Sequence, residues 1–282
     1  MKKISKISLQ KGLTLVELLI ASTLSLIIML FISNIMLTSG RTALQSEGLA
    51  QAQENGRFIL SWLQENVRMA GMPYPSDKVR NRVQPFADVC AATTLPPAAN
   101  ADCSLDQTNS ANSDRLAVQR TFTNDIVYGT NQSRSDCTGV EITTLSDGDL
   151  VVDLYWVETN NNNTGGVLKC VTYNAETHQP LHAVQEIANG IEGMQVLYGV
   201  RSGAEAMFRS NVNRYVSLAD LSSNDLENNI GAVRISILTR AFTERSAETR
   251  ARRYILLDAA PVTFNDAVTR HIQTTTIFLP NE

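Results

Sequence analysis

The sequence lacks the short motifs that mark the commonest enzyme classes. No G-x-S-x-G, H-E-x-x-H, P-loop or G-x-G-x-x-G pattern occurs in its 282 residues. Its four cysteines form no C-x-x-C pair, and its three histidines do not lie near them in sequence. We therefore expect no metal, no cofactor and no catalytic activity.

A calcium loop is the one metal site that the acidic residues suggest. Asp147, Asp149 and Asp153 could form a calcium loop, but the glutamate that ends an EF-hand loop is missing. A Gly-Asp turn explains the first two aspartates without any ion. We consider calcium the weaker interpretation.

Lysine is scarce after the first residues, because only Lys78 and Lys169 follow an apolar run from Leu13 to Leu37. By the positive-inside rule, the lysines before the run stay cytoplasmic and everything after it is exported. Removing residues 1–12 takes away four of the 24 basic residues and none of the 28 acidic ones, so the formal charge falls from −4 to −8. Such a surface does not attract nucleic acid. The early lysines are Lys2, Lys3, Lys6 and Lys11.

A cluster of arginines interrupts this acidic composition late in the chain. Glu244 and Glu248 are interleaved with it and dilute its charge. We interpret the cluster as a solvated hairpin tip, and contact with an acidic partner or DNA is the alternative. Its members are Arg240, Arg245, Arg250, Arg252 and Arg253.

The apolar run from Leu13 to Leu37 carries a single charge, Glu17. Its 25 residues span about 37 Å as a helix, enough to cross a hydrocarbon core of about 30 Å. An A-x-A site of an ordinary secretory signal is not evident. An acid inside a membrane helix costs a few kcal/mol unless it is paired. Cleavage after Gly12 would place a new α-amino group four residues before Glu17, on the same helical face; protonation of Glu17 in the membrane is the alternative.

The string KGLTLVELLIAS, residues 11–22, resembles the type III prepilin signal. It combines a basic leader, a glycine before the cut, an apolar first residue and a glutamate at the fifth mature position. The resemblance implies that prepilin peptidase cleaves between Gly12 and Leu13 and that Leu13 is then N-methylated, although most members of this class have phenylalanine there. It also implies that Glu17 helps to register one subunit against the N-terminus of its neighbour.

The helix is expected to continue beyond the membrane run to Ala70, where Gly71 and Pro73 stop it. This gives one rod of about 87 Å. Beyond a loop-like stretch over 73–112, short runs rich in β-branched and aromatic residues predict an antiparallel sheet packed on the helix, an α+β fold. The expected strands are 116–122, 150–157, 167–173, 194–200, 233–239 and 272–279. The expected divisions are a leader (1–12), a transmembrane half-helix (13–37), an amphipathic half-helix (38–72) and a β-rich head (73–282).

All four cysteines lie in the exported part, where an even count favours two disulfides. Sequence permits three connectivities. Sequential pairing, Cys90 with Cys103 and Cys137 with Cys170, closes local loops and is our preference.

A narrower resemblance comes from AQENGRFILSWLQENVRMAGM, residues 52–72, which is similar to the segment after the anchor in PilW-type minor pilins. The resemblance implies a type IV pilin-like fold and pairs Cys137 with Cys170, and the Cys90–Cys103 region looks like a subgroup insertion. Further matches in the expected order are NSDRLAV (112–118), DCTG (136–139), GGVLKC (165–170), NGIEGMQVLYGV (189–200) and GAVRISILTR (231–240).

We therefore expect a non-enzymatic minor pilin that acts in the initiation or tip complex of a type IV pilus, supporting piliation, twitching motility and DNA uptake. The implied partners are prepilin peptidase, other minor pilins, the major pilin, the inner-membrane assembly platform and the lipid bilayer. The implied location is the inner membrane with the head in the periplasm, and then the surface pilus. A type II secretion minor pseudopilin, a membrane-tethered periplasmic enzyme or binding protein, and a DNA-binding pilin are the alternatives.

Overall fold

A computed structural model describes residues 12, 14–73, 86, 103–107, 113–125, 132–159, 165–201, 212–223, 226, 229–243 and 248–280. The chain divides into two compact units, Met1–Ser46 and Glu47–Glu282. We call the second the head unit, and each is treated separately below.

One long helix, α1 (Leu15–Val67), contributes to both units. Its residues up to Glu47 are exposed, and burial begins at Gly48. No proline interrupts the helix, and the first turn carries Glu17, which favours the positive helix end. At the other end the chain tightens into turns, where Gly71 adopts a φ of 70° and donates its amide to Gln119 in the sheet at 2.9 Å. The structure has one helix over Leu15–Val67, where the sequence predicts one from Leu13 to Ala70.

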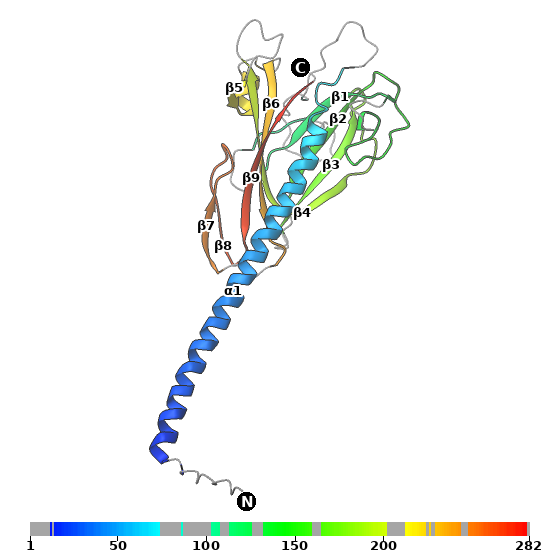
Figure 1. Cartoon of the computed structure of the whole chain (residues 1–282). Helices are drawn as coiled ribbons and strands as arrows, with labels where there is room; N and C mark the ends of the chain where they lie inside the picture. Colours follow the sequence, from blue (N-terminus) through cyan, green and yellow to red (C-terminus); the bar gives the residue numbers. More distant parts are fainter. Residues whose placement is uncertain are drawn as a thin grey trace, which may run out of the picture. The chain divides into compact units, whose positions relative to one another are not determined.

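The head unit is built on a seven-stranded antiparallel sheet in the order β1-β2-β3-β4-β6-β9, with β5 paired to β4, and β7 and β8 form a separate hairpin (Figure 1). A short helix, α2 (Leu218–Ser223), follows β5. The expected α+β class is confirmed. The strands are β1 (Leu116–Thr121), β2 (Leu150–Glu158), β3 (Gly166–Asn174), β4 (Gln185–Arg201), β5 (Val212–Val216), β6 (Ile230–Arg240), β7 (Arg250–Tyr254), β8 (Val262–Asp266) and β9 (Arg270–Phe278).

Within the head unit, α1 packs across one face of the sheet (Figure 1). Ile59, Leu63 and Val67 are fully buried there, at the four-residue spacing of one helical face. Along β2, Tyr155 joins this core, whereas the next residue, Trp156, belongs to a second cluster on the opposite face, as expected from the two-residue period of a strand. Burial on both faces explains the nearly continuous apolar sequence of β2.

Three side-chain hydrogen bonds to the backbone also join the helix and the sheet. Asn55 donates to the carbonyl of Asn189 in β4 at 2.8 Å. Thr239 in β6 donates to the carbonyl of Ala52 at 2.9 Å. Gln273 in β9 donates to the carbonyl of Gln53 at 2.7 Å. These contacts position α1 over three strands.

β4 is the strand at which the sheet forks. Its first part pairs with β3 and its last residues pair with β5, so the stretch between them has an open edge on that side. Ser113 and Asp114 fill this gap: the amide of Met194 donates to the Ser113 hydroxyl at 3.1 Å, and the amide of Val196 donates to Asp114 Oδ2 at 2.7 Å. The other carboxylate oxygen of Asp114 accepts the amide of Gln107 at 2.8 Å. A buried carboxyl group thus takes the place of a missing strand.

Burial raises the pKa of Asp114 to about 8, against the two amide hydrogen bonds, which favour the ionised form. In the unfolded chain an aspartate titrates near pH 4. The folded state therefore binds the proton of Asp114 more tightly than the unfolded chain does. The stability that the protonated carboxyl group contributes is complete below about pH 4 and is lost as the pH rises to about 8. We expect the free energy of unfolding to fall over this window, by at most about 1.4 kcal/mol per pH unit from this group.

Denaturant unfolding of the wild type and Asp114→Asn across this pH range measures the effect. The asparagine variant is expected to be less stable than the wild type near pH 4, by about 1–3 kcal/mol, because one amide donor loses its acceptor. Its pH slope is expected to be flatter, so this difference should shrink as the pH rises. Equal slopes in the two proteins would show that another group causes the dependence.

The six strands expected from the sequence correspond to β1, β2, β3, β4, β6 and β9, with β4 much longer than predicted. β5, β7, β8 and α2 were not predicted. Most of the expected loop over 73–112 lies outside the described residues. Within it, Phe86 forms an isolated bridge with Val118, and Leu105 forms one with Arg115.

Candidate functional site

The first turn of α1 contains a reciprocal hydrogen-bonded cap. The amide and the hydroxyl of Thr14 each donate to Glu17 Oε2 at 3.2 Å, and the amide of Glu17 donates back to the Thr14 hydroxyl at 3.3 Å. This is a capping box, in which a threonine before the helix and a glutamate three residues later satisfy each other's orphan donors. Glu17 therefore has a partner within its own turn before any cleavage.

Sequence reasoning missed the role of Thr14, although the T-x-x-E pattern of residues 14–17 is a recognisable signal of a helix start. Gly12 is exposed, and Leu13 lies outside the described residues. One residue, Leu13, separates the bond between them from the cap at Thr14, and α1 begins only at Leu15. The helix from Leu15 is also long and apolar enough to cross a membrane, by length and composition.

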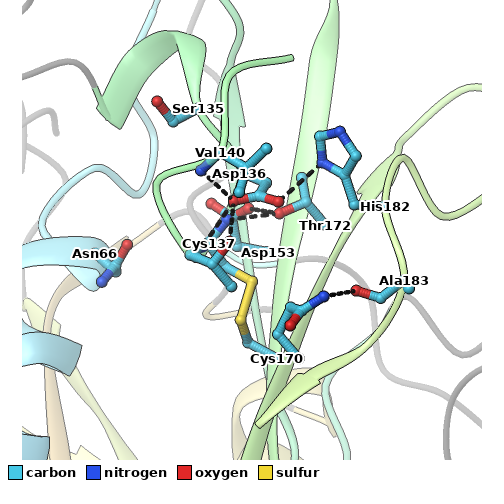
Figure 2. Close-up of a disulfide and its surroundings, with 12 residues drawn as sticks. Asn66, Ser135, Asp136, Cys137, Val140, Asp153, Cys170, Thr172, His182 and Ala183 are labelled. Atoms are coloured by element: carbon cyan, nitrogen blue, oxygen red, sulfur yellow. Dashed lines mark hydrogen bonds and ion pairs between the residues drawn. A yellow bond between two sulfur atoms is a disulfide. The ribbon is translucent and has the colours of Figure 1, made fainter. Parts of the chain in front are cut away.

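A second cluster surrounds the Cys137–Cys170 disulfide in the head unit (Figure 2). The two sulfurs are bonded at 2.10 Å, and both cysteines are buried. The bridge ties the loop after β1 to the middle of β3. Cys103 is also disulfide-bonded, and Cys90 lies outside the described residues, so their pairing stays a prediction.

Behind the disulfide lies a buried ion pair between Arg120 on β1 and Asp153 on β2. Arg120 Nε donates to Asp153 Oδ2 at 2.7 Å, and both side chains are at most 3% exposed. The guanidinium also donates to the carbonyls of Ser133 and Ser135 at 3.1 and 2.6 Å, so it holds the loop that leads to the disulfide. Thr172 completes the chain of contacts: its hydroxyl donates to Asp153 at 2.6 Å and accepts the amide of the disulfide cysteine, residue 137, at 2.8 Å.

Asp136, next to the disulfide, organises the tight turn that follows. Its Oδ1 accepts the amides of Thr138 and Val140 at 2.8 and 2.9 Å, which is a local side-chain-to-backbone cap. Its Oδ2 contacts His182 Nδ1 at 2.8 Å, which brings the β3–β4 connection against this loop (Figure 2). The disulfide, the Arg120–Asp153 ion pair and the Asp136 contacts together hold the 133–140 loop on the sheet.

The expected arginine cluster is not one solvated tip. Arg240 is buried and pairs with Glu192 at 3.5 Å, so the prediction was wrong for this residue. Glu192 also pairs with Arg270, which in turn binds Asp266 of β8 at 2.7 Å and stacks on the ring of Phe264 at 3.8 Å. The charge of Arg240 has a structural role, because the network of ion pairs around Glu192 fastens the β7–β8 hairpin to the main sheet. Arg250 and Arg253 are exposed, as expected for a hairpin, and Arg245 lies outside the described residues.

The three aspartates considered for calcium make different contacts in the structure. Asp147 accepts the amide of Asn124 at 2.7 Å, and Asp149 accepts the amide of Ser146 at 2.9 Å, so both stabilise turns. Asp153 is the buried partner of Arg120. In the part of the chain that the structure describes, no three metal-ligating side chains gather into a group that could hold an ion.

Comparison with known proteins finds one family model and one solved structure. A protein-family model described as Type IV Pilus-assembly protein W matches residues 154–281. Among solved structures, a type IV-like pilin from Thermus thermophilus is similar, with 12% sequence identity, a TM-score of 0.44, and coverage of 81% of this chain and 96% of that chain. None of the curated proteins matches.

Proposed function

We propose that the chain is a minor pilin that acts in the initiation or tip complex of the pilus, because residues 154–281 match the model of the type IV pilus-assembly protein W family. The family is one of pilus-assembly proteins, which confirms the expectation of a non-enzymatic protein. The observation that carries the proposal is this family match combined with an exposed apolar helix whose first turn contains Glu17.

The exposed helix supports membrane storage of the subunit. Its large apolar side chains from Leu15 to Leu37 are about half or more exposed, and water is an unfavourable solvent for such a surface. A lipid bilayer or a bundle of similar helices would cover it. Assembly then consists of exchanging lipid contacts for contacts with neighbouring helices, so the anchor in the inner membrane becomes the packing surface in the pilus.

Cleavage between Gly12 and Leu13 would convert the cap into an assembly site. The new α-amino group would lie four residues before Glu17, while the amide and hydroxyl of Thr14 remain available to the same carboxylate. Glu17 can then be held by its own Thr14 until the amino group of a neighbouring subunit approaches. The carboxylate would thereby set the stagger between two subunits at a small desolvation cost, because it stays hydrogen-bonded throughout.

The proposed partners follow from this path. Prepilin peptidase processes the 1–12 leader and methylates Leu13, the inner-membrane platform extracts the subunit, and other minor pilins and the major pilin pack against it. The divisions at 13–37, 38–72 and 73–282 would serve as membrane anchor, connecting helix and periplasmic head. The family match favours this pilus role over a secretion-system pseudopilin, and the acidic mature chain argues against direct DNA binding.

Intact-mass and N-terminal analysis of membrane-extracted protein tests the processing step. We expect a chain that begins at methylated Leu13. An unprocessed Met1 terminus would contradict the proposal.

Glu17→Leu tests the assembly step. Removing the carboxylate should abolish recovery of the chain in the pilus fraction, because nothing then pairs with the neighbouring amino group, while the Cys137–Cys170 bridge still forms. Thr14→Val is the matched control for the cap: it removes the hydroxyl but retains the charge, so incorporation should survive. Normal incorporation of Glu17→Leu would show that the helix is only a tether.

A further inference from the structure

The outer edge of β9 has no strand beside it in the described part of the chain. β9 pairs with β6 over nine residues without a register shift, and it ends the seven-stranded sheet. The amide of Leu279 donates to the carbonyl of Gly231 at 3.1 Å, which identifies the β9 residues that are hydrogen-bonded to β6. Alternate residues therefore bond to β6, and the amides and carbonyls of the residues between them point away from it.

These outward groups belong to Ile272, Thr274, Thr276 and Phe278. Among the described residues, none makes a backbone hydrogen bond to these outward amides and carbonyls. Thr274 and Phe278 are exposed, and the Phe278 side chain is 66% accessible. A row of backbone donors and acceptors is thus presented at the surface beside an exposed aromatic ring.

The other edges of the main sheet differ from this one. Phe86 bridges Val118 on the outer edge of β1, and Leu105 bridges Arg115, the residue before β1. The open middle of β4 is filled by Ser113 and Asp114. β5 is only five residues long and carries Arg214. Covering, shortening and charging an edge are the usual protections against unwanted pairing.

β9 has none of these protections over most of its length. The sequence IQTTTIFL, residues 272–279, contains no charge and no proline, and its register with β6 shows no bulge. β-branched and aromatic residues such as these favour extended chains. An uncharged, regular, exposed edge is a template for another strand.

We propose that the outer edge of β9 binds an extended strand of a neighbouring subunit, which lengthens the sheet by one strand. The occupant is a strand because only an extended backbone offers unpaired donors and acceptors at the same spacing, whereas the backbone groups of a helix are already bonded internally. The strand is uncharged opposite 272–278, because the edge offers no charge to pair. That the neighbour is another pilus subunit rests on the proposed function.

Hydrogen exchange resolved at single amides tests the pairing directly. In the purified full chain in detergent, the amides of Thr274 and Thr276 should exchange fast, and those of Thr275 and Ile277 should be protected by β6. In the pilus fraction, Thr274 and Thr276 should become slower by about 100-fold or more, because they then donate to a strand. Unchanged exchange at these two amides would overturn the proposal.

Thr274→Pro tests the consequence for assembly. Proline at this position removes an outward amide and no bond to β6, so the head should still fold. Thr274→Val is the matched control, because it also loses the hydroxyl contact with Ser236 but retains the amide. Thr274→Lys provides a second edge variant that leaves the whole backbone intact. Recovery in the pilus fraction should fall about tenfold in the proline and lysine variants and not in the valine variant.

Three results separate the possible failures. Equal recovery of the proline, lysine and valine variants, with loss of recovery in Glu17→Leu, would overturn the β9 inference alone. Normal recovery of Glu17→Leu would overturn the proposed function. A dimer of the purified chain that Thr274→Pro abolishes would also overturn the inference, because a second copy would then fill the edge.

Discussion

Replacing Arg120 by methionine is expected to lower the free energy of unfolding by about 3–5 kcal/mol. The substitution leaves Asp153 as a buried carboxylate without its cation, and it also removes donors from the carbonyls of Ser133 and Ser135. Breaking one side of a buried ion pair is far more costly than replacing both sides by apolar residues. Urea unfolding of the full chain in detergent, followed by tryptophan fluorescence, measures the loss.

Two further variants control the Arg120 measurement. Arg120→Met combined with Asp153→Leu should recover part of the stability, because no unpaired charge is then buried. Arg57→Met removes a pair in which both side chains are at least 70% exposed, so it should change stability by less than about 1 kcal/mol. If Arg120→Met lost no more than Arg57→Met, the buried pair would not be a structural element of the head.

Removing the Cys137–Cys170 disulfide is expected to cost about 3–4 kcal/mol, from the loss of a cross-link between residues 33 positions apart. Both cysteines should be changed to alanine together, because a single change leaves a reactive thiol. The cost arises mainly in the unfolded chain, which gains freedom when the loop is opened. Urea unfolding of the double variant against the wild type gives the value.

The disulfide and the Arg120 ion pair are connected through Thr172, so their effects should not add. The combination of all three substitutions is expected to cost less than the sum of the separate losses, since each change already loosens the 133–137 loop. Simple additivity would show that Thr172 does not couple the two features.

Much of the fold could be predicted because its signals are local. The helix to Val67 follows from an uninterrupted apolar run, an amphipathic continuation and the stop at Gly71. Strands such as β2 and β3 are dense in β-branched and aromatic residues, and these types suit a pleated, buried surface. The Cys137–Cys170 bridge was implied by resemblance to a family and is present in the structure.

The parts that sequence reasoning missed depend on contacts between distant residues. β7 has the sequence RARRY, which contains little apolar character. Its hairpin is placed by the contact of Asp266 on β8 with Arg270 on β9 of the main sheet. Arg240 was assigned to a charged tip because its neighbours in sequence are charged, whereas its partner Glu192 lies on another strand. Asp114 gives no sequence signal of its burial, because the gap in β4 exists only in the assembled sheet.

The three hydrogen bonds between α1 and the sheet also determine how the head unit carries mechanical load. A pull along the helix would enter the sheet at the side chains of Thr239 and Gln273 and at the carbonyl of Asn189. These contacts involve β4, β6 and β9, which are neighbouring strands: β4 pairs with β6, and β6 pairs with β9. The tension is thus divided among three strands, and several bonds must break together before the helix can be peeled from the head.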